Sequence, residues 1–172
     1  VKLIHLYRSA SDLIKQTIRH ILCAGAGAMK LTVFSDYTLR VLMYLANERD
    51  RLATIPEIAA AYEVSENHLM KVVHQLARAG IVESVRGKGG GIRLAREPGE
   101  IRLGQVIRSS EGNSPIVECL ADAPVSCKIA PACRLSAILV SSFEAFYSKL
   151  DEYTLADLVQ QPQQFTAFFV AK

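Results

Sequence analysis

The chain has 172 residues, half of them apolar, and its twenty Lys and Arg against seventeen Asp and Glu give a net charge of +3. This composition argues against disorder and allows one good core, or one small domain with an added dimerisation element. Charged residues interrupt every apolar run before it reaches the roughly 18 to 20 residues that span a bilayer, so we expect no membrane association. No nucleophile, base and acid stand together in the sequence, so we do not expect an enzyme.

Residues 1–28 are expected to be an N-terminal extension, either sequence upstream of a native start at Met29 or a dispensable segment of the protein. The apolar positions fall at helical spacing, but Arg19 and His20 interrupt what would be the apolar core of a signal peptide. We therefore expect a cytoplasmic protein whose four cysteines are reduced thiols. Cys23, within the extension, is not expected to be a ligand.

Residues 29–96 contain helix-capping and helix-ending residues at the spacing of a helix-turn-helix domain. Apolar residues at helical spacing predict a first helix from Phe34 to about Asn47, capped by Thr32 or Ser35. The segment 54–57, Thr-Ile-Pro-Glu, is a capping box with proline in the first turn, and it predicts a short second helix.

A third helix is predicted to begin after Ser65 and to stop at Gly80. Its outward face carries Glu66, Asn67, His68, Lys71 and Gln75, which can bond base edges or phosphates, and the candidate DNA contacts are Ser65, Asn67, His68 and Lys71. Polar outward faces are common on solvated helices, so this helix alone is weak support for DNA binding.

The segment after the third helix predicts a β-hairpin wing. Residues 81–85 and 92–94 alternate as strands, and the turn between them is rich in glycine and basic residues. Arg86, Gly87 and Lys88 are therefore further candidate DNA contacts, since glycine allows close approach to a sugar-phosphate wall and the two charges suit phosphates or a narrow minor groove. An ordinary flexible hairpin is the alternative, and a nucleotide-binding loop is less favoured because these glycines do not open a helix.

Three cysteines, Cys119, Cys127 and Cys133, lie in a proline-containing stretch without apolar periodicity. Their spacing does not match the close pairs of structural zinc sites, and three thiolates leave a metal or cluster one ligand short. Iron-sulfur chemistry fits better. Zinc binding or a disulfide switch in a protein-interaction module is the alternative.

A long helix is predicted directly after the cysteines, because apolar residues recur at helical spacing between Leu135 and Leu150. The winged helix is already complete, so this stripe is expected to pack against its copy in a homodimer, which suits two-fold symmetric operator DNA. The expected organisation is a connecting helix and linker over 97–118, a cysteine loop over 119–133, the dimerisation helix and a short terminal helix over 134–160, and a tail over 161–172. The fold class is mainly α with a small β-hairpin wing.

Four segments resemble the Rrf2 family of winged-helix regulators, and within it the nitric-oxide-sensing NsrR branch. They are 29–40 (MKLTVFSDYTLR), 85–94 (VRGKGGGIRL), 131–135 (PACRL) and 151–158 (DEYTLADL). The IscR branch places its first two cysteines closer together and adds a histidine ligand, whereas no histidine follows Cys119 here. The RirA branch, which responds to iron, shares both the cysteine-loop pattern and the wing.

The resemblance implies a homodimeric repressor that releases double-stranded operator DNA when nitric oxide reacts with an iron-sulfur cluster. It implies Cys119, Cys127 and Cys133 as cluster ligands, with Asp36 of the other subunit as the fourth. A 4Fe-4S cluster is expected rather than 2Fe-2S. A regulator responding to iron or cluster supply is the alternative within the family, and for Asp36 the alternative is a first-turn charge that favours the helix dipole.

Overall fold

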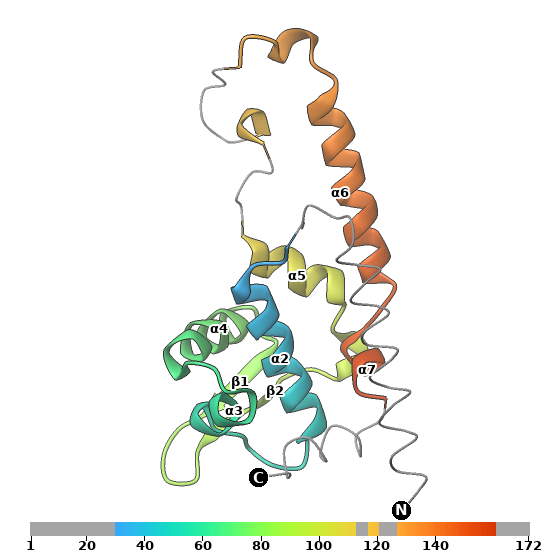
Figure 1. Cartoon of the computed structure of the whole chain (residues 1–172). Coiled ribbons are helices and arrows are strands. Elements are labelled where there is room, and N and C mark those ends of the chain that lie inside the picture. Colours follow the sequence, from blue (N-terminus) through green and yellow to red (C-terminus); the bar gives the residue numbers. More distant parts are fainter. Residues whose placement is uncertain (1–29, 113–116, 121–126, 161–172) are drawn as a thin grey trace, which may run out of the picture. The chain divides into compact units, whose positions relative to one another are not determined.

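The structure is a computed structural model that describes residues 30–112, 117–120 and 127–160 (Figure 1). The predicted extension over 1–28, Met29, the tail over 161–172 and part of the cysteine loop lie outside the described residues. The described chain is mainly helical with one two-stranded antiparallel sheet, which confirms the predicted fold class. Among the described residues, no helix is long and apolar enough to cross a membrane.

Helix α2 (Val33–Asn47) is the centre of the domain, in contact with α4, α5, α7 and β2 (Figure 1). Thr32 caps its start, because its side chain accepts a hydrogen bond from the backbone N–H of Ser35. The helix buries Val41, Leu42 and Leu45 almost completely.

Helices α3 (Ile55–Tyr62) and α4 (Glu66–Arg78) form the predicted helix-turn-helix. The capping box at Thr54 and Glu57 is present, with proline in the first turn of α3. Glu63, which follows α3, has φ of 55°, so the tight turn bends in the left-handed region without a glycine. The buried face of α4 joins the core through Leu69, Val72, Val73 and Leu76.

Strands β1 (Val82–Val85) and β2 (Gly91–Leu94) pair in the register Val82 with Leu94 and Val85 with Gly91. Ala53 adds a short bridge to Ile92, with backbone hydrogen bonds of 3.0 and 2.8 Å. A Cβ atom at Gly91 would meet the Ala53 carbonyl, which explains the glycine at this position. The bridge fixes the base of the hairpin to the segment that precedes α3.

The remaining elements follow the hairpin. A 3-10 turn, η1 (Pro98–Glu100), leads to α5 (Leu103–Glu111). Two more such turns follow: η2 (Glu118–Leu120) contains Cys119, and η3 (Ala130–Ala132) lies between Cys127 and Cys133. Helix α6 (Leu135–Asp151) packs on α5, and α7 (Leu155–Leu158) returns to α2 and buries Leu155.

Candidate DNA interface and cysteine site

The face of α4 opposite its buried residues is a stripe of polar and basic side chains. At 100° per residue, the positions farthest from the buried face are Asn67, Lys71, His74 and Arg78, and all four residues are exposed. Side chains of these residue types can hydrogen-bond base edges and phosphates. Asn67 and Lys71 are two of the predicted candidates, whereas His74 and Arg78 were not predicted, although the helical period alone places them in the stripe.

The other two candidates on this helix lie beside the stripe. Ser65 is the N-cap residue of α4 and is exposed, and its side chain makes no capping hydrogen bond. His68 is exposed but turned toward α2, because its ring centroid lies 6.0 Å from that of Tyr37. His68 is therefore at the edge of the exposed polar stripe of α4 and not at its centre.

The tip of the wing presents Arg86, Gly87 and Lys88, all of them exposed. Gly87 has φ of 104° and Gly89 has φ of 79°, so both require the conformational freedom of glycine. The turn is closed by a hydrogen bond of 2.9 Å from Gly90 N–H to the carbonyl oxygen of Gly87. A compact turn of this kind holds its two cations close together on an exposed tip.

A groove of about 450 Å³ runs along the basic side of α4. Its walls come from three helices, and the lining residues are Phe34, Lys71, His74, Gln75, Arg78, Ala79 and Ser109. The groove therefore joins the reading face to the start of α2 and the end of α5.

A partly buried polar network holds α3 against α2. The Tyr44 hydroxyl donates a 2.6 Å hydrogen bond to Oε1 of Glu57, and Arg51 forms an ion pair with the same carboxylate. The hydrogen bonds from Arg51 and Tyr44 lower the pKa of Glu57 to about 2, although burial opposes the shift. The pKa of Tyr44 is raised to about 12, mainly by burial and secondly by its hydrogen bond to Glu57. The network fixes the helix that precedes the recognition turn.

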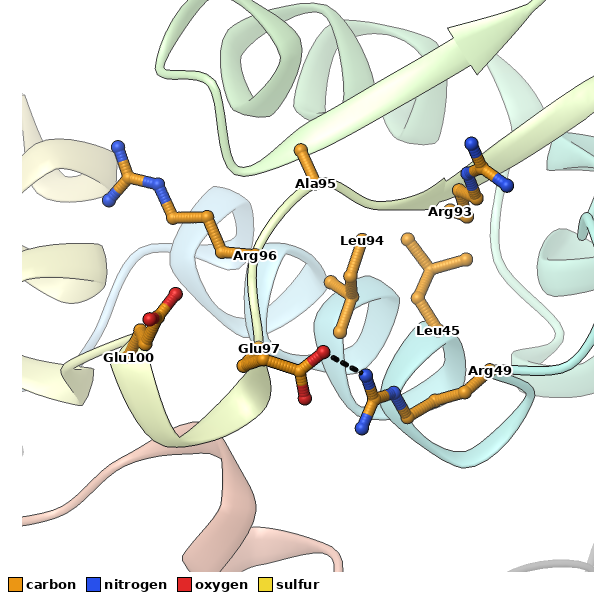
Figure 2. Close-up of a pocket in the computed structure, with 8 residues that line it drawn as sticks. All are labelled: Leu45, Arg49, Arg93, Leu94, Ala95, Arg96, Glu97 and Glu100. Atoms are coloured by element: carbon orange, nitrogen blue, oxygen red, sulfur yellow. Dashed lines mark hydrogen bonds and ion pairs between the residues drawn. The ribbon is translucent and has the colours of Figure 1, made fainter.

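A second pocket, of about 270 Å³, lies between the end of α2 and the end of β2 (Figure 2). Arg49 and Glu97 form an ion pair of 2.6 Å across it, and Arg93, at its edge, pairs with Glu83. Glu100 adds a second carboxylate to the lining. Because acidic and basic groups are mixed here, this pocket does not select a ligand of one charge.

The three predicted ligands Cys119, Cys127 and Cys133 are free thiols, each half-buried. The turn η3 separates the last two, and Cys133 stands directly before the first turn of α6. Within the described ranges, no three Cys, His, Asp or Glu side chains come together as a metal site. One protomer therefore does not gather the three cysteines and Asp36.

Asp36 lies in the first turn of α2 with its side chain 49% exposed. It forms an ion pair of 2.9 Å with Arg40, one turn along the helix. A carboxylate at this position is accessible to another molecule, and it would have to share or leave Arg40 on binding a metal.

Comparison with known proteins shows to which family the chain belongs. Residues 31–161 match the model of the Rrf2 family, described as iron-dependent transcriptional regulators. The chain belongs to the Rrf2 family. The HTH-type transcriptional regulator NsrR of Bacillus subtilis is 46% identical over 136 residues, which cover 78% of this chain and 93% of that protein. The NsrR of Halalkalibacterium halodurans is 39% identical, over 84% of this chain and 99% of its own length.

Solved structures of Rrf2 regulators share the fold. The cysteine regulator CymR of B. subtilis has a TM-score of 0.59 and 29% identity, covering 77% of this chain and 98% of that one. The IscR of T. potens has a TM-score of 0.61 and 26% identity, covering 79% and 90%. The predicted resemblance is thus confirmed at the level of the family and of its NsrR relatives, and it supports a transcriptional regulator.

Proposed function

We propose that this Rrf2 protein is a cytoplasmic, homodimeric DNA-binding repressor that senses nitric oxide through an iron-sulfur cluster. The observation that carries the DNA-binding part is the exposed stripe Asn67, Lys71, His74 and Arg78 on α4, accompanied by the basic wing tip. An α-helix of this kind fits the major groove, and the wing suits the backbone or the minor groove beside it. The NsrR relatives support the same role.

The sensing part rests on the donor set. Three free thiols follow one another within one segment, and thiolates are the ligands that iron-sulfur clusters take in proteins. Cys119, Cys127 and Cys133 would hold the cluster, with Asp36 of the partner subunit as the fourth ligand, and 4Fe-4S is the expected form. Bound there, such a cluster supplies iron that reacts with nitric oxide.

The chain's own residues would then link that site to DNA. If Asp36 of one protomer meets the cysteines of the other, the first turn of one α2 is tied to the other protomer. That tie would hold the two recognition helices at the spacing of the half-sites. Release of Asp36 returns it to Arg40, with which it pairs at 2.9 Å.

The homodimer is supported by α6. None of its residues is buried in the single chain, and Leu135 and Ile138, which share one face of the helix, are 54% and 55% exposed. A helix with an apolar side of this kind needs a covering surface, and a second copy supplies one with two-fold symmetry.

The test compares DNA affinity of the chain purified without oxygen, the same material after nitric oxide, and the Cys127→Ser variant, at one salt concentration. We expect the intact chain to bind the most tightly and to show an iron-sulfur absorption spectrum. Equal affinities of all three would refute the sensing mechanism. An intact chain that responds to iron removal but not to nitric oxide would favour the iron-responsive branch of the family. Colourless protein containing zinc would favour the redox or zinc-switched alternative.

A further inference from the structure

The last turn of α5 is hydrogen-bonded to α4, the recognition helix of the proposed function. The side-chain amide nitrogen of Gln75, in α4, donates a hydrogen bond of 2.8 Å to the carbonyl oxygen of Ser109. The last four carbonyls of a helix have no partner within the helix, and Ser109 belongs to the last turn of α5. Gln75 therefore satisfies a backbone group that needs an external donor.

The electrostatics of this contact are also favourable. The carboxyl end of a helix carries partial negative charge, and the groove that contains Ser109 is lined by Lys71, His74 and Arg78 of α4. The end of α5 thus meets the basic side of α4, with the Gln75 bond fixing their register.

The same turn of α5 is bonded to the start of α2. The hydroxyls of Ser35 and Ser110 lie 2.7 Å apart, and both residues are buried. The Ser110 hydroxyl also lies 3.0 Å from the carbonyl oxygen of Ile107, to which it can donate. Glu111 Oε1 accepts a further hydrogen bond of 2.8 Å from the N–H of Thr32.

The same turn of α5 precedes the cysteine segment, since α5 ends at Glu111 and Cys119 is eight residues further along the chain. The other end of that segment is tied back to α5 through α6. Arg108 pairs with Asp151 at 3.2 Å, and its guanidinium lies 4.7 Å from the ring centroid of Tyr147.

We infer that Gln75 positions the recognition helix through Ser109 and is not itself a DNA contact, and that the last turn of α5 is the joint between the cysteine segment and that helix. The second half of this inference rests on the proposed function. On the helical wheel, Gln75 lies to one side of the reading stripe and is partly buried, which agrees with a positioning role.

The first experiment compares Gln75→Met with Gln105→Met, the same chemical change at an exposed position of α5. The probes are a duplex selected from a random library by the unaltered chain and its single-base variants. We expect Gln75→Met to weaken binding to every duplex by one common factor, about two- to tenfold for a lost hydrogen bond. Hydrogen exchange of the α4 amides should be faster in Gln75→Met and unchanged in Gln105→Met. Lost preference at a single base position, or unchanged exchange in α4, would overturn the positioning role.

The second experiment measures the ratio of dissociation constants between the Cys127→Ser form and the intact form, with and without Gln75→Met or Ser110→Ala. We expect either substitution to bring this ratio closer to one, while thermal unfolding confirms that each variant is folded. A large ratio that neither substitution changes would refute the joint. A ratio of one in the unaltered background would instead refute cysteine-dependent sensing and with it the joint, and the exchange data would still decide the role of Gln75.

Discussion

Replacing Glu57 by Gln tests the network that fixes α3 against α2. The carboxylate pairs with Arg51, accepts from the Tyr44 hydroxyl at 2.6 Å and caps the backbone N–H of Thr54 at 3.3 Å. Its pKa falls from 4.5 to about 2, and at about 1.4 kcal/mol per pKa unit this would correspond to roughly 3 kcal/mol before solvent screening is considered. The side chains of Glu57 and Arg51 are 32% and 47% exposed, so solvent screening reduces the expected contribution to about 1–2 kcal/mol.

The pH dependence has a defined sign. A carboxyl group with a lowered pKa in the folded state stabilises the fold fully above its ordinary pKa of 4.5 and loses that effect as the pH falls toward 2. We therefore expect Glu57→Gln to lower the free energy of unfolding by about 1–2 kcal/mol at pH 7 and by less than half of that at pH 3.

Urea unfolding at the two pH values measures both quantities. Glu144→Gln, on the exposed surface of α6, is the matched control and should change stability by less than about 0.5 kcal/mol. If Glu57→Gln costs no more than the control at pH 7, or costs the same at pH 3 as at pH 7, the reasoning from this network is wrong.

Three further predictions concern the α5–α6 packing, the turn and the wing. A Cβ at Gly104 would collide with the Tyr147 carbonyl and the Asp151 carboxylate, so Gly104→Ala should cost about 1–3 kcal/mol, seen as a lower midpoint of thermal unfolding; an unchanged midpoint would contradict the packing. Glu63→Gly should raise the free energy of unfolding by about 0.5 kcal/mol or more, seen as a higher urea midpoint, because glycine adopts the left-handed φ of 55° without strain. A lower midpoint would show that the glutamate side chain contributes more than the strain costs. Arg86→Ala should weaken DNA binding on all sequences and reduce the salt slope by about one, whereas an unchanged slope would remove this residue from the phosphate contacts.

The sequence determined the helix boundaries and the fold class because their signals are local. The capping box at Thr54 and Glu57 and the glycine-rich turn of the wing each act within a few residues, and the structure contains both. The family resemblance came from short motifs of the same kind and is confirmed by the family match over residues 31–161.

Helix α4 carries a longer polar stripe than predicted. Its buried apolar face was assigned correctly, whereas His74 and Arg78 were not among the candidate DNA contacts although the helical period places them opposite the core, and the DNA contacts themselves stay a prediction. His68 was selected as a polar neighbour, but its orientation toward Tyr37 depends on how α4 crosses α2. Crossing geometry is set by side-chain packing between helices and cannot be read from one helix alone.

The hydrogen bonds at the end of α5 were decided by tertiary structure. Gln75 and Ser109, like Ser35 and Ser110, are far apart in sequence, and serine and glutamine have many possible hydrogen-bond partners. Their pairing follows from the burial of α2 between α4 and α5, which brings these groups together once the apolar faces pack. The sequence therefore determined which residues form the helices, the wing and the cysteine segment, whereas only the packed chain decided which polar groups meet, because long-range contacts depend on how apolar faces pack together.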